Sequence, residues 1–355
     1  MANPLVSICV PTYNRAAWLR DSLKSICGQD YTPVEILISE NGSDDGTEDI
    51  GREAAKADPR VRYVRHPRNL GVYGNHNFCI DESRGELLTF FHDHDERSPQ
   101  MVSEYAALLQ QHPEVGVVCS DWELINEAGE LVGVRDSPVP AVTPGLEYIS
   151  QTMRSGRSSI GVPGMLVRRS ALGASRFDER GPAGFGDFVV WFELAERAVV
   201  GHIDRRLWRW RQQRASQSAR TIESMVKDYE INLGGYCDAH LTRWPQHAAL
   251  VARWRADIRR FLFWALAFEL GLHFRNETGA GARRSQVPTI FEILGYRLSA
   301  EEVRRVRELL AVHRTGPLQH AVYATIELLV GLGFTWPLGQ ATHYHGAARA
   351  ILGLR

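Results

Sequence analysis

The alternation of short apolar segments with helical patterns constrains the fold of this chain most. Residues 6–10 and 87–91 are compact apolar runs of the kind that form strands buried on both faces. Leu19, Leu23 and Ile26 recur between such runs at the spacing of an amphipathic helix. Strands that alternate with helices predict an α/β fold with a largely parallel sheet. Further strands are expected at residues 34–39, 60–64 and 115–119.

The pattern changes near residue 220, after which apolar residues follow helical spacing. We therefore predict two domains, an α/β domain over residues 1–220 and a helical domain over residues 221–355. Residues 253–274 form a long helical candidate that carries arginines beside aromatic side chains. Such a helix can lie on an anionic membrane surface, or it can pack against the first domain or a second subunit. Acceptor binding, a peripheral membrane contact and a homodimer all stay open for this region.

Composition narrows the functional classes. The 355 residues carry 41 Lys and Arg against 42 Asp and Glu, a net charge of −1, which argues against a nucleic-acid partner. The first residues lack a signal-peptide pattern, and no run of about 18 uncharged apolar residues occurs. We therefore expect a cytoplasmic protein, with the inner face of the membrane as an alternative place of action. An odd number of cysteines without close pairs predicts free thiols: Cys9, Cys27, Cys79, Cys119 and Cys237.

The strongest polar motif is His92-Asp93-His94-Asp95, directly after the predicted strand 87–91. In an open α/β sheet, ligands bind beyond the carboxyl ends of the strands. Carboxylates suit Mg²⁺ or Mn²⁺, and an imidazole shifts the preference toward Mn²⁺. A cation here could bridge the two phosphates of a sugar nucleotide and stabilise a departing diphosphate. The alternative interpretation is a polar turn that caps the next helix.

Two further motifs follow predicted strands. Asn41 lies in a turn-rich segment after residues 34–39, where its amide could read a nucleobase edge or merely shape a turn. Residues 11–15 follow the first strand; Tyr13 could stack on a base and Arg15 could approach a phosphate, unless the segment is a plain turn. Both motifs could face the crevice that the His92–Asp95 motif predicts.

Three more segments carry candidate residues. Asn69 to Gly71 is a turn that could approach a nucleotide or lie on the surface. Asp187 precedes a helical pattern and could be a helix cap or a general base for an acceptor hydroxyl. Arg209 and Arg211 alternate with tryptophans, which would place both arginines on one face of a strand, near a diphosphate or in solvent.

In this order and spacing, the segments resemble the family-2 glycosyltransferases with a GT-A fold. The resemblance covers about residues 4–218, through residues 6–15, 35–47, 69–71, 77, 85–95, 164–169, 177–179, 186–191 and 211–218. It implies a Rossmann-like mixed sheet flanked by helices. It also implies inverting transfer of a sugar from a nucleotide-diphosphate sugar, such as a UDP-sugar, to an acceptor hydroxyl with the help of Mn²⁺ or Mg²⁺. The acceptor class stays open between glycan, lipid-linked and small-molecule acceptors, and the setting would be surface polysaccharide or glycoconjugate biosynthesis.

The resemblance also assigns roles to individual residues. It gives Asp187 the role of catalytic base and gives the divalent cation to Asp93, His94 and Asp95. It assigns nucleotide binding to Pro11, Thr12, Tyr13, Arg15, Glu40, Asn41, Asn69, Gly71, Asp93 and Arg211.

The chain departs from the family pattern at several positions. Glu40 and His94 stand where the family usually has aspartates, so either His94 or Asp95 could be the main metal ligand. Gly186 replaces the acidic residue that normally precedes the base, and Gln213 stands where many members have histidine.

Two rival functions remain. A non-catalytic sugar-nucleotide-binding module would fit the altered metal residues. A sugar nucleotidylyltransferase would need a glycine-rich loop bearing arginine and lysine after the first strand, and residues 11–14 do not form such a loop.

Overall fold

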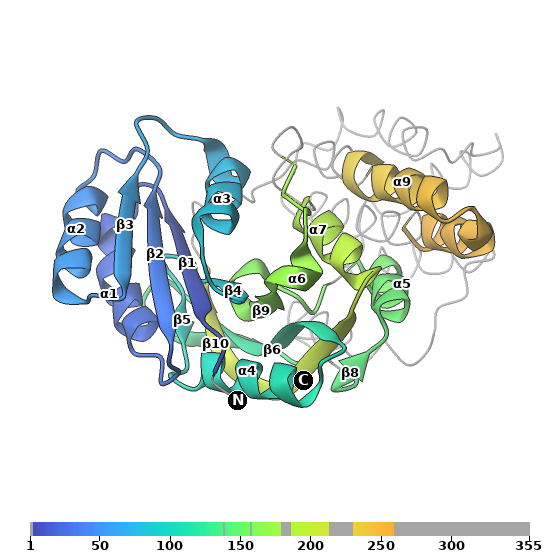
Figure 1. Ribbon diagram of the computed structural model, residues 1–355, viewed down its shortest axis with the longest axis horizontal. Coiled ribbons are helices and arrows are strands. Elements are labelled where there is room, and N and C mark those ends of the chain that lie inside the picture. Colours follow the sequence, from blue (N-terminus) through green and yellow to red (C-terminus); the bar gives the residue numbers. More distant parts are fainter. Residues whose placement is uncertain (1–2, 138, 157, 179–185, 213–229, 259–355) are drawn as a thin grey trace, which may run out of the picture. The chain divides into compact units, whose positions relative to one another are not determined.

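The computed structural model describes residues 3–137, 139–156, 158–178, 186–212 and 230–258 (Figure 1). These residues belong to one compact unit that ends at Ile258. The predicted helical domain 221–355 and the helical candidate 253–274 therefore lie mostly outside the described residues.

Ten strands form one mixed sheet within the described residues, as expected for a GT-A type fold. The strand order is β3-β2-β1-β4-β9-β6-β10-β5, with β7 paired to β6 and β8 paired to β10. Neighbours among the first four strands run parallel, β9 runs antiparallel to both β4 and β6, and β6 is parallel to β10. The strands are β1 Val6–Thr12, β2 Val34–Glu40, β3 Val61–Arg65, β4 Leu87–Phe90, β5 Glu96–Arg97, β6 Val115–Ile125, β7 Leu131–Arg135, β8 Val142–Thr143, β9 Met165–Arg168 and β10 Val199–Arg211.

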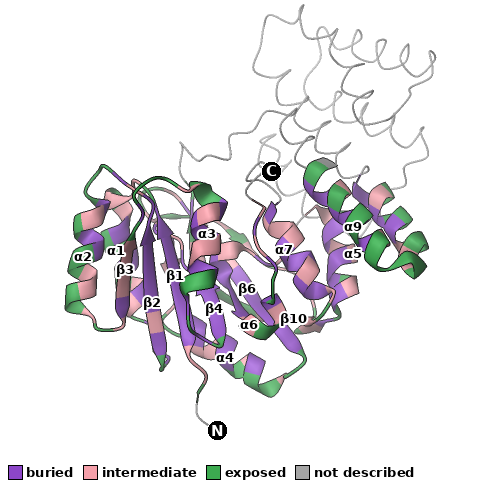
Figure 2. Cartoon of the chain, turned by 45° about the horizontal axis from the view of Figure 1, so that its top comes forward, coloured by how far each residue is buried: buried purple, intermediate pink, exposed green. Residues whose placement is uncertain are grey.

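Helices flank this sheet, and their outward faces are exposed, whereas the central strands β1, β2, β4 and β9 are almost wholly buried (Figures 1 and 2). The described helices are α1 Ala16–Cys27, α2 Thr47–Ala57, α3 Gly71–Glu82, α4 Met101–Gln111, α5 Gly145–Ser155, α6 Arg169–Leu172, α7 Gly186–Ala195 and α9 Gly235–Arg243. Short helical turns cover Val162–Gly164, Glu230–Gly234 and Pro245–His247, and residues 248–258 are again helical.

Strand β1 shows why the apolar runs predict this layering. All its residues are buried. Ile8 and Val10 belong to the same core cluster as Leu19 of α1. Cys9 lies on the other face of the strand, where its thiol is 3.6 Å from the carbonyl oxygen of Cys79 in α3. A strand covered on both faces needs a continuous apolar run rather than an alternating one.

The register of the parallel strands sets where the site lies. Thr12 at the end of β1 pairs with Glu40 at the end of β2. Cys9 pairs with Phe90, so β4 ends three residues earlier than β1 and the chain continues as the segment 91–95. The strand ends that carry the predicted motifs therefore meet at one edge of the sheet.

The residues after 230 pack on the sheet's helices. Glu196, just after α7, accepts hydrogen bonds from Tyr236 and His240 of α9. Trp254 is fully buried, and its indole N–H donates to Ser150 of α5 at 2.8 Å. Residues 230–258 thus share one compact unit with the α/β core.

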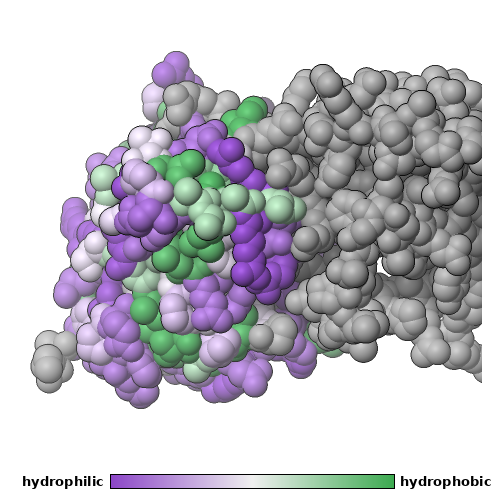
Figure 3. Space-filling model, turned by 90° about the vertical axis from the view of Figure 1, so that its right-hand side faces the viewer, coloured by the Kyte–Doolittle hydropathy of each residue, from purple (hydrophilic) through white to green (hydrophobic). Residues whose placement is uncertain are grey.

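The surface of the described residues is mixed in polarity. On the face drawn in Figure 3, apolar side chains form several patches separated by hydrophilic ones. Among the described residues, no helix combines the length and hydropathy that a membrane span requires. All five cysteines are free thiols, as the sequence predicts.

Candidate active site

The loops that follow β1 and β2 are joined by hydrogen bonds into one edge. Asn14, whose φ of +52° is left-handed, receives Asp44 N–H on its side-chain oxygen and donates its own N–H to the Ser43 hydroxyl at 2.9 Å. The next two backbone N–H groups donate to Thr47 at 3.0 Å and to Asp45 at 2.9 Å. Short polar side chains that bond nearby backbone groups hold both loops in defined conformations.

The β1 end presents the predicted nucleoside-facing residues. Pro11 is buried within β1, and Tyr13 is 39% exposed, so part of its side chain is accessible to a ligand. The Thr12 hydroxyl is buried and has no hydrogen-bond partner within the described residues. A buried hydroxyl without a partner is costly, which makes it a candidate donor to a ligand.

Glu40 at the end of β2 is fully buried and is used inside the protein. One carboxylate oxygen accepts the Ser43 N–H at 2.5 Å, and the other lies 2.8 Å from the Arg65 guanidinium. Its partner set indicates that Glu40 closes the turn that carries Asn41.

The Asn41 side chain ties two loops together. Its amide donates to the Asn69 side chain at 2.8 Å and to the Gly71 carbonyl at 3.2 Å, and its oxygen accepts Leu70 N–H at 2.8 Å. Both amide hydrogens are therefore engaged by protein acceptors. This placement favours an indirect role in which Asn41 holds residues 69–71 in place, and direct base reading by Asn41 stays a prediction.

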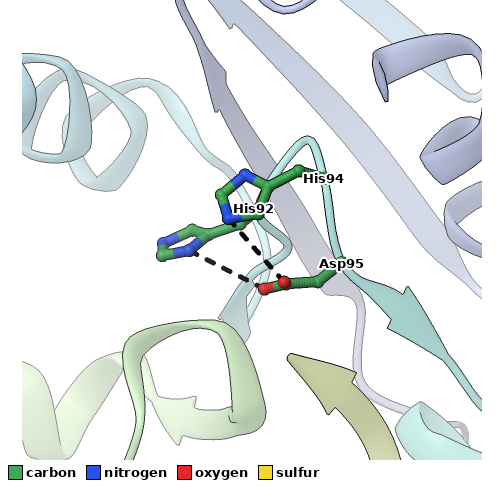
Figure 4. Close-up of side chains that lie close together, drawn as sticks. All are labelled: His92, His94 and Asp95. Atoms are coloured by element: carbon green, nitrogen blue, oxygen red, sulfur yellow. Dashed lines mark ion pairs between the residues drawn. The ribbon is translucent and has the colours of Figure 1, made fainter. Parts of the chain in front are cut away.

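The segment after β4 brings two imidazoles to one carboxylate (Figure 4). His92 Nδ1 lies 3.9 Å from Asp95 Oδ2, and His94 Nε2 lies 3.7 Å from Asp95 Oδ1. One ligand atom from each of these residues lies within 4.8 Å of the others. The predicted metal residues His94 and Asp95 are thus brought together, and His92, which the sequence-based assignment did not include, joins them.

Asp93 lies beside this cluster rather than in it. Its Oδ1 atom is 2.9 Å from His94 Nδ1 and 3.7 Å from the Arg15 Nε. The predicted phosphate-facing Arg15 and the predicted metal residue Asp93 therefore meet, and Asp93 links the β1 loop to His94.

Burial tunes the ionisation of this segment. Desolvation lowers the pKa of His92 well below its usual range, so at neutral pH its imidazole carries a free lone pair. Desolvation raises the pKa of Asp95, against the opposing effect of the nearby Arg97 cation. Burial lowers the pKa of Arg97 to about 10, which still leaves it charged at neutral pH.

The Asp95 carboxylate has one unsatisfied oxygen. Oδ1 accepts the backbone N–H of Arg211 at 2.9 Å, while Oδ2 is buried without a hydrogen-bond partner among the described residues. The nearest cation is Arg97, 3.6 Å away. A buried carboxylate with one imidazole nitrogen near each of its oxygens fits the donor set of a divalent cation.

Arg211 braces this loop. Its guanidinium donates to the carbonyl oxygens of His94, Asn126 and Glu127 and to the Glu96 carboxylate, and it lies over the Trp18 ring with 5.2 Å to the centroid. Arg209 also reaches Glu96, so both arginines share a strand face as predicted. Because most of its donors have protein partners, Arg211 is suited to holding the loop; diphosphate binding by Arg211 stays a prediction.

Asp187 lies in the first turn of α7, where its Oδ1 accepts Phe188 N–H at 3.0 Å. The residue before it explains one departure from the family pattern. A Cβ atom on Gly186 would lie 2.8 Å from the ring of Tyr73. Tyr73 in turn stacks on Phe177 with ring centroids 5.3 Å apart, so an acidic side chain has no room at position 186.

Aromatic contacts connect α7 with the His92–Asp95 segment. Phe177 contacts Trp191 of α7 and His76 of α3, and His76 lies edge-on to His92 at 5.8 Å. Asn77 fixes Phe177 through two backbone hydrogen bonds of 2.9 Å. His76, Tyr73 and Trp18 belong to no motif in the sequence, and their positions in the helices that follow the motif-bearing loops are the only signal that could have found them.

The fold defines the class of protein. The mixed sheet and its polar strand ends are the GT-A type arrangement, and the structure is similar to that of Staphylococcus aureus TarS 1–349, solved in complex with UDP-GlcNAc. That likeness has a TM-score of 0.59 at 18% identity and covers 93% of each chain. A mannosyltransferase from Pyrobaculum calidifontis, solved with GDP-Man and Mn²⁺, is similar with a TM-score of 0.50 at 15% identity, over 92% of this chain and 88% of that one.

The family follows from the sequence match. Residues 7–171 match the model of the family described as glycosyl transferase family 2. Over these residues the chain matches a family-2 glycosyltransferase domain, and its fold is of the GT-A type.

Curated relatives match parts of the chain. The GalNAc(5)-diNAcBac-PP-undecaprenol beta-1,3-glucosyltransferase of Campylobacter jejuni is 37% identical over 94 residues, 26% of this chain and 30% of the relative. The putative colanic acid biosynthesis glycosyl transferase WcaA of Escherichia coli is 34% identical over 31% of this chain and 39% of its own. The putative glycosyltransferase EpsH of Bacillus subtilis is 24% identical over 66% of this chain and 62% of its own. The matches thus span less than two thirds of each relative.

Proposed function

We propose that this protein is an inverting glycosyltransferase that moves a sugar from a nucleotide-diphosphate sugar to an acceptor hydroxyl. The observation that carries the proposal is the buried Asp95 carboxylate at the strand ends of a domain that matches family 2. Its Oδ2 accepts no hydrogen bond among the described residues, and its two oxygens lie 3.9 Å from His92 Nδ1 and 3.7 Å from His94 Nε2. Structural neighbours crystallised with UDP-GlcNAc, UDP or GDP-Man support a nucleotide-sugar donor. UDP is the first nucleotide to test.

Charge balance supports a divalent cation in the donor complex. Asp93 is matched by Arg15, and Asp95 by Arg97, so the segment has no surplus positive charge for a ligand. A nucleotide-sugar diphosphate brings about two negative charges into a half-buried site, where unpaired charge is costly. Bound Mn²⁺ or Mg²⁺ would supply charge stabilisation for the departing diphosphate.

The protein's own residues would position the two reactants. Tyr13 offers a stacking face, and the tied loops at residues 12–16 and 43–47 form the wall beside the nucleoside. Asp187 is proposed as the base that takes the proton from the acceptor hydroxyl as the new bond forms. Its position on a helix anchored by buried Trp191 would hold the carboxylate steady.

The acceptor is proposed by class. Relatives named for an undecaprenol-linked glycan and for colanic acid suggest a role in surface polysaccharide or glycoconjugate biosynthesis. A lipid-linked acceptor would place the protein at the inner face of the membrane, and a glycan or small molecule would not require this.

Calorimetric titration of UDP with Mn²⁺, with Mg²⁺ and with a chelator tests the donor site. We expect tighter UDP binding with metal and weaker coupling in Asp95→Ala. Equal UDP affinity with and without metal would contradict the metal-assisted mechanism. Metal-dependent binding without hydrolysis or transfer of any UDP-sugar would instead favour a non-catalytic binding module.

A further inference from the structure

The His92–Asp95 segment differs in chemistry from an all-carboxylate cation site. Two of its three converging groups are imidazoles, and their side chains are 27% and 17% exposed, whereas Asp95 is fully buried. The cluster is therefore anchored by a buried anion and open on its imidazole side, where an ion can enter.

Asp93 sets the tautomer of His94. The ionised carboxylate can only accept a hydrogen bond, so the 2.9 Å contact requires a proton on His94 Nδ1. His94 Nε2 then carries the lone pair, and this is the atom that faces Asp95. A carboxylate that holds the far nitrogen of a histidine is the usual support for a metal-bound imidazole.

The geometry is close to that of bound ligands. Ligand atoms at about 2.1 Å from one ion stand roughly 3 Å apart at right angles. The observed separations of 3.7 and 3.9 Å to the two Asp95 oxygens exceed this by less than 1 Å, which side-chain rotation can close. The Arg97 guanidinium donates its hydrogen bonds to the carbonyl oxygens of His92 and Pro163, and it lies 3.6 Å from Asp95 Oδ2 as an ion pair without a hydrogen bond.

We propose that His92, His94 and Asp95 together hold the divalent cation, that Asp93 orients His94 from behind, and that this nitrogen-rich set selects Mn²⁺ or Co²⁺ over Mg²⁺. Magnesium prefers oxygen ligands in octahedral geometry and gives up its waters reluctantly, whereas imidazole suits later divalent ions. The inference rests on the proposed function for the presence of a cation. It departs from the sequence-based assignment by adding His92 as a ligand and moving Asp93 outside the set.

Metal binding to the full-length protein tests the proposal without any transfer assay. Mn²⁺ and Mg²⁺ affinities are measured by calorimetry, with and without UDP, and Co²⁺ is titrated to record its ligand-field absorption. We expect about tenfold or tighter binding of Mn²⁺ than of Mg²⁺, and a Co²⁺ spectrum that changes in His92→Ala. Removing the supporting carboxylate in Asp93→Asn should weaken Mn²⁺ by about 10- to 100-fold.

Two further variants test the ligand type and provide a control. His92→Asp should bring the Mg²⁺ affinity closer to that of Mn²⁺, because it replaces a nitrogen ligand with oxygen. His112→Ala removes a half-exposed histidine outside this segment, whose Nδ1 lies 3.1 Å from Glu114, and it should leave both affinities and the Co²⁺ spectrum unchanged.

Equal affinity for Mg²⁺ and Mn²⁺, an unchanged Co²⁺ spectrum in His92→Ala, or no Mn²⁺ binding even with UDP would overturn the proposal. Failure of the ligand set is distinguishable from failure of the proposed function. If a variant without His92 still binds UDP and transfers sugar with Mg²⁺, the glycosyltransferase function stands and only the proposed ligand set is wrong.

Discussion

Gly186 offers a sharp test of the structure, because the residue before the proposed base is acidic in the family pattern and glycine here. A Cβ atom at this position would lie 2.8 Å from Cε2, 2.9 Å from the hydroxyl and 3.1 Å from Cζ of Tyr73. The ring cannot easily move away, since Tyr73 is only 9% exposed and stacks on Phe177 with an interplanar angle of 12°. We therefore expect Gly186→Ala to be destabilising.

The magnitude follows from two opposing effects. Overpacking of a fitted core by one methyl group costs about 1–3 kcal/mol. Alanine in place of glycine in a helix interior returns up to about 1 kcal/mol, and less in the first turn where Gly186 lies. The expected net loss in the free energy of unfolding is therefore about 1–2 kcal/mol, and Gly186→Glu should lose more.

A double-mutant cycle separates the clash from other effects. The free energy of unfolding is measured by urea denaturation for Gly186→Ala, Tyr73→Ala and the double variant. Truncating Tyr73 removes the atoms that the new methyl group would meet, so Gly186→Ala should be neutral or stabilising in that background. A coupling energy near zero, or a stabilising Gly186→Ala in the wild-type background, would refute the packing explanation for the missing acidic residue.

Three further predictions concern catalysis, the loop and pH. Asp187→Asn should lower the transfer rate by about 10²- to 10⁴-fold with little change in UDP affinity. The control Glu193→Gln, on the same helix, should leave both the transfer rate and the UDP affinity unchanged. Near-normal turnover of Asp187→Asn would remove Asp187 from the role of base. Arg211→Lys should weaken Mn²⁺-dependent UDP binding, because an ammonium cannot replace the guanidinium's several directed hydrogen bonds to residues 94–96 and 126–127. An unchanged UDP affinity in calorimetry with Mn²⁺ would contradict the role of Arg211 in holding the loop. Burial lowers the pKa of His76 to about 4, so between pH 6.5 and 4 the unfolded state binds a proton that the folded state does not, and roughly 3 kcal/mol of stability should be lost over this window. Denaturation of His76→Gln should show a flatter profile there, and an unaltered profile would exclude His76 as its cause.

Some features of the site follow from hydrogen bonds that no local pattern reveals. The Arg211 N–H bond to Asp95 spans 116 residues, and the Asn77 pair with Phe177 spans 100. Arg211 and Asn41 could therefore be predicted from the sequence as ligand contacts, but the protein acceptors that engage most of their donors could not. The same limit hid His92, because its approach to Asp95 depends on how the loop turns after β4.

The sequence by itself determined the strand–helix alternation and the end of the sheet at which chemistry is placed. Strands predicted at residues 6–10, 34–39, 60–64, 87–91 and 115–119 correspond to β1, β2, β3, β4 and β6. Such strands are readable because a strand covered on both faces must be apolar throughout its length. The polar motifs follow these runs directly, and parallel strands place their carboxyl ends at one edge.

Tertiary structure decided which of those polar groups are free to act. Asp95 was one of several carboxylates in the sequence. Only strand register and loop closure bury it, leave its Oδ2 without a hydrogen bond among the described residues, and bring one imidazole near each of its oxygens. Folding also joined residues 230–258 to the first unit, because Tyr236 and Trp254 find their partners on α5 and beside α7. Local patterns record which face of an element is apolar, but the identity of each side chain's partner depends on contacts between segments far apart in the chain.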